Sequence, residues 1–224
     1  MKPAKPKRAV AIAAPSLEGA EHFPRFPSGE TLMGRTYSEV LLDNVGWSGQ
    51  SASQAVFNTV IFKDAHLDKT RLRSVQVCDV RFAGGDIALG DWIGATFRRA
   101  EFLKTRLSGF NASEGSFRDV VFRDCQLSYA VFQFTKFERC RFEDCDLVDS
   151  TFQGATLTEV TFRHCNLASA QFSDARLTGL DLRGSHLPGL QMAMDQLREV
   201  TIDPSQAAVI ASLTQVKIRP VDEE

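Results

Sequence analysis

Large apolar residues recur at every fifth position of this chain between Leu42 and Leu187. All thirty positions of this series are apolar, and thirteen of the 17 phenylalanines fall on it. A second series of mostly small residues lies two positions earlier and includes Ala65, Ala100 and Cys145. Residues two apart point to the same side of an extended backbone. Each five-residue unit is therefore predicted to be a very short strand with two inward side chains, followed by a corner. A period of five fits neither a helix nor a long strand.

Phenylalanine and leucine separate into different columns when every fourth unit is compared. One column reads Leu42, Phe62, Phe82, Phe102, Phe122, Phe142, Phe162 and Leu182, and the next reads Trp47, Leu67, Ile87, Leu107, Leu127, Leu147, Leu167 and Leu187. The sorting predicts that residues 20 apart stack on one another, so that four units complete one turn of a four-sided coil. Phe132, Phe152 and Phe172 of the third column should then face the first column across the interior.

The five cysteines follow the same phase. Cys125, Cys145 and Cys165 are 20 residues apart and should form one buried column, Cys140 is also inward, and Cys78 falls in an outward position. The number is odd and no CxxC spacing occurs, which disfavours a disulfide framework and a zinc site. Buried cysteines behave as small hydrophobic residues, so we expect a packing role here.

Several units match a known repeat. Cys145-Asp-Leu-Val-Asp149, Cys165-Asn-Leu-Ala-Ser169, Ala65-His-Leu-Asp-Lys69 and Cys140-Arg-Phe-Glu-Asp144 place a small residue two positions before a central Leu or Phe. They resemble the A(D/N)LXX unit of the pentapeptide-repeat family. The resemblance implies an all-β fold, a right-handed quadrilateral parallel β-helix of about 7 to 8 coils over residues 31–189.

The two ends depart from the period. Residues 1–30 contain five prolines and are predicted to form a partly disordered or capping extension, with Phe23 or Phe26 over the first coil. Residues 190–224 are predicted to form a C-terminal cap.

Within this cap, Asp203, Pro204 and Gln206 fit the N-cap, N1 and N3 positions of a capping box, so we expect a short helix at about residues 204–213. Val209, Ile210 and Leu213 would share one side of this helix. They would cover the last coil or, as the resemblance implies, form a homodimer.

Composition narrows the functional classes. The net charge of −2 argues against electrostatic binding to nucleic acid over a broad surface, and no direct nucleic-acid binding is expected. No apolar run reaches the 18 residues typical of a membrane span. The basic start is followed by only six apolar residues, Ala9–Ala14, which is shorter than the core of a secretory signal and favours a cytoplasmic chain.

No enzyme motif is present. The chain lacks GxGxxG, P-loop, GxSxG and HExxH patterns. His66, His164 and His186 fall in outward positions, and acids such as Glu143 lie among arginines, where cross-coil salt bridges explain them better than acid–base catalysis. We therefore predict no enzyme, no catalytic or metal-binding residue and no cofactor.

Two functions remain open. The first is a non-enzymatic scaffold that binds a protein partner through its flat faces. The alternative, implied by the resemblance to quinolone-resistance members, is a DNA mimic that binds DNA gyrase or topoisomerase. Mimicry requires a densely acidic face, whereas the face of the first column carries seven acids and seven bases.

Tyr129 and Phe134 are aromatic residues at outward positions. They are candidate partner contacts, because aromatics are enriched at interface hot spots, or they pack over a corner.

Overall fold

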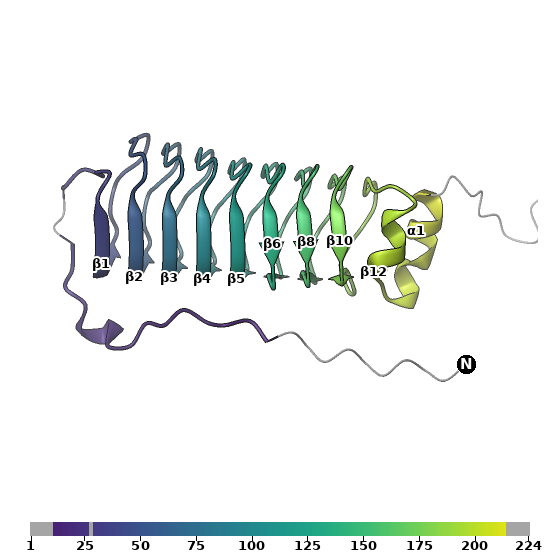
Figure 1. Ribbon diagram of the computed structural model, residues 1–224, viewed down its shortest axis with the longest axis horizontal. Helices are drawn as coiled ribbons and strands as arrows, with labels where there is room; N and C mark the ends of the chain where they lie inside the picture. The colour runs from purple at the N-terminus through teal and green to yellow at the C-terminus, as the bar shows by residue number, and fades with distance from the viewer. Residues whose placement is uncertain (1–10, 27–28, 214–224) are drawn as a thin grey trace, which may run out of the picture.

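The five-residue units wind into a right-handed, four-sided parallel β-helix of about eight turns, in the computed structural model of residues 11–26 and 29–213 (Figure 1). Neighbouring strands pair in parallel with a register of 20 residues, as in Phe62↔Phe82 and Phe82↔Phe102. This register confirms the predicted stacking of residues 20 apart. One turn of 20 residues is called a coil below.

Twelve strands form a single sheet, with three 3₁₀ helices and one α-helix at the ends. The strands are β1 (Thr36–Asp43), β2 (Val56–Lys63), β3 (Gln76–Ala83), β4 (Thr96–Leu103), β5 (Ser116–Arg123), β6 (Lys136–Glu138), β7 (Arg141–Glu143), β8 (Thr156–Thr158), β9 (Thr161–Arg163), β10 (Arg176–Thr178), β11 (Leu180–Asp181) and β12 (Val200–Thr201). The helices are η1 (Ala20–His22), η2 (Gln196–Glu199), η3 (Pro204–Gln206) and α1 (Ala207–Leu213).

The strands β1 to β5 are longer than the pattern of five predicts. Each covers eight residues and spans two units, so the expectation of very short strands throughout is wrong for these coils. A single residue with positive φ, such as Asp79 in β3 (φ 54°), turns the corner while pairing continues on both sides of it. The other two sides of each coil are joined by single-residue bridges such as Asp146↔Asn166.

The interior is filled by stacked rings. Phe142 has no exposed surface, and its ring lies 4.7 Å from that of Phe122 and 4.6 Å from that of Phe162, with interplanar angles of 3° and 9°. Phe152 meets the same ring edge-on from the opposite side at 6.3 Å. Parallel strands lie about 4.8 Å apart, which matches the separation of stacked aromatic rings, so one ring per coil fills the column without strain.

Four faces and four corners describe the outside of the rod. We number the faces by their central residues: the first face runs from Leu42 to Leu182, the second from Trp47 to Leu187, the third from Ala52 to Phe172 and the fourth from Phe57 to Leu177. The corner residue is the one two positions after each central residue. Corner residues have positive φ in almost every coil.

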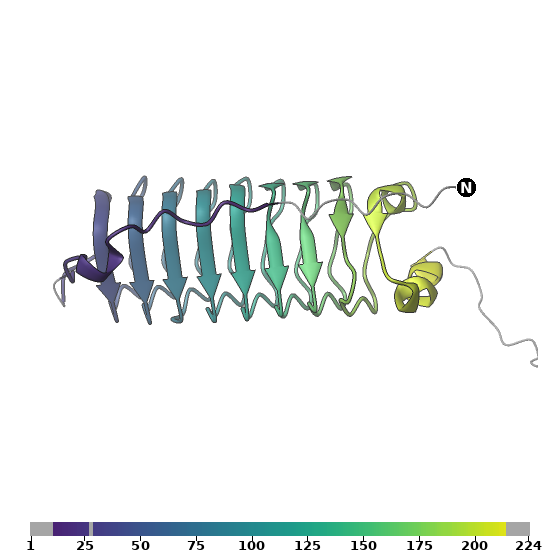
Figure 2. The same ribbon diagram turned by 90° about the horizontal axis from the view of Figure 1, so that it is seen from below.

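The N-terminal segment covers the first coil and then turns back. The Phe26 ring lies 5.6 Å from the rings of Tyr37 and Trp47. Its N–H donates to the Leu41 carbonyl at 2.9 Å, and the Leu41 N–H donates to the Pro24 carbonyl at 3.0 Å. On the N-terminal side of η1, residues 11–19 lie along the outside of the rod and cross the strands β1 to β5 (Figures 1 and 2). We call residues 11–19 the arm.

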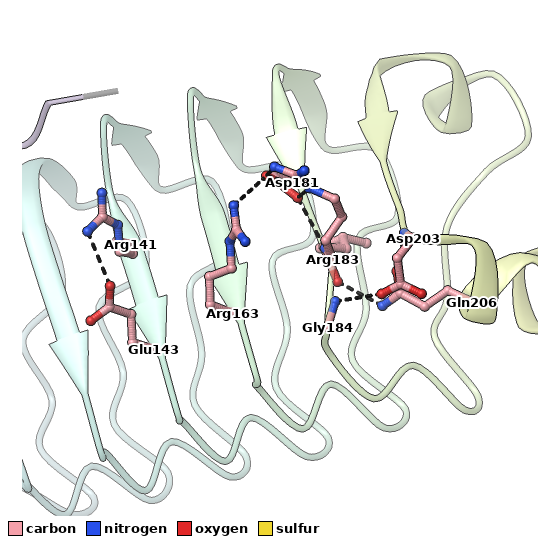
Figure 3. Close-up of polar contacts among 9 residues, drawn as sticks. Arg141, Glu143, Arg163, Asp181, Arg183, Gly184, Asp203 and Gln206 are labelled. Carbon is pink, nitrogen blue, oxygen red and sulfur yellow. Dashed lines mark hydrogen bonds and ion pairs between the residues drawn. The ribbon is translucent and has the colours of Figure 1, made fainter. Parts of the chain in front are cut away.

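Two glutamines close the C-terminal end. Gln206 Nε2 donates to the carbonyls of Leu182 (2.8 Å) and Ser185 (2.7 Å). Gln196 Nε2 makes the equivalent pair of bonds at the end of the third face, to the carbonyls of Phe172 (2.9 Å) and Ala175 (2.6 Å). The predicted capping box is confirmed, because Asp203 Oδ1 accepts from the Ser205 N–H and Gln206 Oε1 accepts from the Asp203 N–H (Figure 3). Leu182 and Phe172 also accept from the N–H groups of Ser185 and Ala175, so each glutamine satisfies one carbonyl, that of Ser185 or Ala175, that no further coil pairs with.

The C-terminal helix follows this box. Val209 and Ile210 are half-buried and pack against the core, whereas the side chain of Leu213 lies outside the described residues. Their role in a homodimer stays a prediction. Among the helices of the described residues, none is long and apolar enough to cross a membrane.

Candidate protein-binding surface

Corner positions that are not glycine carry polar side chains, with three exceptions. Of the 23 non-glycine residues with positive φ in the described part of the chain, twenty are polar, and the others are Leu89, Tyr129 and Phe134. Their exposed fractions are 59%, 63% and 61%. Backbone with positive φ favours Gly, Asn and Asp, and an exposed apolar side chain gains little from burial. Neither local conformation nor core packing therefore explains these three residues.

The three residues border one face. Leu89 and Tyr129 lie on the corner before the third face, two coils apart, and Phe134 lies on the corner after it. The sequence pattern identified Tyr129 and Phe134 as exposed aromatics, and the structure brings them to the two ends of the same five-residue side. The sequence pattern did not identify Leu89, although it occupies the same corner position as Tyr129 two coils earlier.

Glycines of the next coil make room for two of these side chains. A methyl group added at Gly109 would lie 2.7 Å from Leu89 Cδ2, and one added at Gly154 would lie 2.5 Å from Phe134 Cε1. Leu89 and Phe134 therefore rest on the backbone of the adjacent coil, as packing over a corner requires. Both remain more than half exposed, so this packing leaves most of each side chain available to a partner.

The third face carries no charge on the coils of Ala112, Phe132 and Phe152, although Asp91 lies on the coil of Leu89 and the corner residues Glu114 and Asp149 border this area. Its outward side chains there are half-buried and are Asn111, Ser113, Val131, Gln133, Thr151 and Gln153. Ser113 donates its N–H and Oγ–H to Asn111 Oδ1 at 3.1 and 2.7 Å, and Gln133 Nε2 donates to Gln153 Oε1 at 3.2 Å. These bonds hold the outward side chains in place. We call this uncharged area, with Leu89, Tyr129 and Phe134 at its edges, the third-face patch.

Charges on the other faces are neutralised across coils. The pairs include Arg81–Glu101 (2.8 Å), Arg106–Asp86 (2.7 Å) and Arg123–Glu143 (2.8 Å), each joining residues 20 apart. Near the C-terminal end Arg163 and Arg183 both contact Asp181, and Arg141 contacts Glu143 within one unit (Figure 3). The predicted salt bridges between coils are confirmed, and they leave no long run of unpaired acids on these faces.

The candidate chemical groups are placed as the sequence phase predicts. Cys125, Cys140, Cys145 and Cys165 are buried, and Cys78 is half-buried. Burial raises the pKa of the Cys140 thiol to about 12, which keeps it protonated and unreactive.

The histidines of the coils lie on the outside. His66, His164 and His186 are exposed. Within the described residues, no group of three His, Cys, Asp or Glu side chains could hold a metal ion.

A parallel β-helix built from stacked 20-residue coils is a solenoid repeat protein. The family model "Pentapeptide repeat region" matches residues 95–172, 115–192 and 135–207, which together span residues 95–207, a little over half of the chain. The chain belongs to the pentapeptide-repeat family.

Solved structures with a similar fold include other members of this family. HetL, a pentapeptide repeat protein involved in heterocyst differentiation regulation from the cyanobacterium Nostoc sp. strain PCC 7120, is 14% identical, with 75% of this chain and 85% of that chain covered and a TM-score of 0.49. QnrB1, a plasmid-mediated fluoroquinolone resistance protein, is 18% identical in its trypsin-treated form, with coverage of 86% and 99% and a TM-score of 0.37. These values are too low to transfer a function. No curated protein matches the chain.

Proposed function

We propose that this protein is a non-enzymatic scaffold that binds a protein partner through the third-face patch. The observation that carries the proposal is the placement of Leu89, Tyr129 and Phe134 at corners where every other non-glycine residue with positive φ is polar. Protein interfaces are depleted of charge at their centre and enriched in aromatic residues. The patch has both properties, with an uncharged centre and two exposed aromatic rings at its edges.

The rod presents this patch in a fixed shape. The backbone of each coil is bonded to the next, as in Tyr129 N–H to the Val148 carbonyl and Phe134 N–H to the Gln153 carbonyl, at 2.9 and 3.0 Å. Ordering of flexible groups is one of the main costs of association. A surface held in this way avoids much of that cost, so a small patch with two aromatic anchors supports specific binding.

DNA gyrase is the second candidate partner, and the described surface does not favour it. A duplex mimic must present negative charge along a continuous face, whereas the acids here pair with arginines of the adjacent coil. The centre of the patch carries no acid, and the acids at its edges, Asp91, Glu114 and Asp149, form no continuous row. The scaffold proposal therefore predicts that micromolar protein neither inhibits gyrase supercoiling nor protects it from a fluoroquinolone. Protection in that assay would favour gyrase instead.

Site-specific photo-crosslinking tests the proposal. A photoreactive phenylalanine would replace Tyr129 or Phe134 in the source organism, with Asp124 and Asp144 as control positions. The controls are also exposed corner residues with positive φ, but they lie between the first and second faces. We expect one adduct of the same mass from Tyr129 and Phe134, and none from the controls.

The identified partner then allows a quantitative check. The double variant Y129S/F134S should bind it at least tenfold more weakly while keeping the wild-type thermal transition. Equal crosslinking at all four positions, or undiminished binding by Y129S/F134S, would overturn the proposal.

A further inference from the structure

The corner between the fourth and first faces, opposite the Leu89–Tyr129 corner, carries alternating charges in four consecutive coils. Asp79, Arg99, Asp119 and Arg139 occupy it in that order. Arg99 donates hydrogen bonds to both carboxylate oxygens of Asp79. Arg139 Nε and Nη2 donate to the two oxygens of Asp119 at 2.8 Å each. Both carboxylates are buried, with residue exposures of 6% and 8%. Two carboxylates are thus held in fixed positions along the rod.

The arm binds to these same carboxylates through its backbone. The Ser16 N–H donates to Asp79 Oδ1 at 2.9 Å, and the Ala13 N–H faces the Asp119 carboxylate closely enough to lower its pKa. The bonds from Arg139, together with the N–H of Ala13, hold the pKa of Asp119 below its ordinary value. Burial alone would raise the pKa of Asp79, but the bonds from Arg99 and Ser16 outweigh it and lower the pKa. Both carboxylates are therefore charged acceptors at neutral pH.

The spacing of the arm matches the spacing of the coils. Asp79 and Asp119 lie two coils apart, which is about 9.6 Å at the usual strand separation. Ser16 and Ala13 are three residues apart, which is about 9 Å in the polyproline II form of an extended chain, where N–H groups three residues apart point to the same side. An extended segment therefore offers an N–H group to every second coil. Because the carboxylates contact the backbone, this mode of binding sets few demands on the side chains.

The arm is held loosely compared with the coils. Ile12, Pro15 and Leu17 are half-buried, and the remaining residues of the arm up to Gly19 are exposed. The described contacts that fix it are the Ser16 hydrogen bond to Asp79, the approach of the Ala13 N–H to Asp119 and the partial burial of these three side chains. A segment attached this weakly can exchange with another segment of similar shape.

We propose that the corner formed by Asp79 and Asp119 is a binding site for an extended peptide segment of another protein, and that the arm is its built-in competitor. The arm shows the chemistry that fits: an extended run that is mostly apolar and uncharged from Ala11 to Leu17, with N–H groups three residues apart. A tethered competitor acts at an effective concentration of about millimolar. A partner segment therefore displaces the arm only if its affinity for the site is higher than that of the arm or if it is itself tethered nearby. This site lies on a different corner from the third-face patch, and the two can be occupied together.

The first test frees the site in the full chain. The variant A13P/S16P removes the two N–H donors, while proline keeps the arm extended. The probe is a fluorescein-labelled peptide with the sequence of residues 9–18, titrated in an anisotropy assay. We expect this peptide to bind A13P/S16P at least tenfold more tightly than it binds the wild-type chain. The same peptide with proline at its two donor positions should not bind.

The second test removes the acceptors. Adding D79G/D119G to A13P/S16P should abolish peptide binding, and glycine suits the positive φ of both positions. Adding D124G/D144G instead is the matched control, because it makes the same change at corner residues of positive φ that the arm does not contact. That variant should bind the peptide as A13P/S16P does. Thermal transitions of all variants establish that each is folded.

Three results would overturn the proposal. The first is no peptide binding to A13P/S16P, and the second is binding that survives D79G/D119G. The third comes from hydrogen exchange of the arm in the wild-type chain. If the amides of Ala13 and Ser16 exchange no faster in D79G/D119G than in the wild-type chain, the two carboxylates do not hold the arm and the proposed site is wrong.

Discussion

Replacing Phe142 by alanine should destabilise the β-helix by about 4 kcal/mol. Truncation of a buried phenylalanine costs about 3–5 kcal/mol, depending on how far the surroundings collapse into the cavity. Phe142 has no exposed surface and lies between the stacked rings of Phe122 and Phe162, with Phe152 edge-on across the interior. Each lost ring pair adds about 0.5–1.5 kcal/mol beyond the buried area. The backbone bonds between coils keep the cavity open, so the upper half of the range applies.

The matched control is the same substitution at Phe134. That side chain is 61% exposed and rests on Gly154 at a corner, so its loss should cost less than about 1 kcal/mol. Urea unfolding of both variants measures the difference. With a slope of about 2 kcal/mol per molar, Phe142→Ala should lower the midpoint by about 2 M, and Phe134→Ala by less than about 0.5 M.

The comparison depends only on which phenylalanine points inward. If the two midpoints agreed to within about 0.5 M at equal slopes, the assignment of Phe142 to the core would be wrong. A change of slope in Phe142→Ala alone would instead indicate that the coils on either side of the cavity unfold separately, as solenoids with nearest-neighbour coupling can do.

Three further predictions concern the thiols, the C-terminal end and acid stability. In the native state a disulfide reagent should label half-buried Cys78 first and Cys145 only on unfolding; rapid labelling of Cys145 would contradict its burial. Gln206→Ala leaves the Ser185 carbonyl without its partner, because the Leu182 carbonyl still accepts from the Ser185 N–H, and it should cost about 1–3 kcal/mol, measured by thermal unfolding, whereas the exposed Gln191→Ala should be nearly neutral. The folded pKa of Asp119 lies below its unfolded value of about 3.9, so its contribution to stability is present above that value and is lost as the pH falls through the folded pKa. Between pH 5 and 3 the wild-type chain should therefore lose more stability than Asp119→Asn, and equal losses would argue against the ion pair.

The core could be predicted from the sequence because inward positions repeat. Phe142 is followed and preceded by inward residues at fixed intervals of 5 and 20, so many positions report the same phase, and Cys145 follows from it as well. The corners were harder to interpret. The pattern distinguishes inward from outward, but it does not show that Leu89 and Tyr129 share a backbone conformation that favours polar residues.

The ends of the chain could not be predicted in the same way. The bond from Ser16 to Asp79 joins residues 63 apart in sequence and belongs to no period. The period also fades before Gln196 and Gln206, whose side chains each take two carbonyls of the last coils. Single contacts of this kind depend on the three-dimensional position of one side chain, and the sequence offers no second example from which to infer them.

The closure of both ends has a consequence for assembly. A parallel β-helix repeats at about 4.8 Å, the spacing of a cross-β fibril, and an open end would be a template on which another chain could continue the sheet. At one end Pro24 and Phe26 bond to Leu41 of the first strand, and at the other the amide groups of the two glutamines take carbonyls that an added chain would need. These groups occupy positions on which another chain would have to build, so we expect the two closed ends to oppose head-to-tail growth of the rod into a fibre.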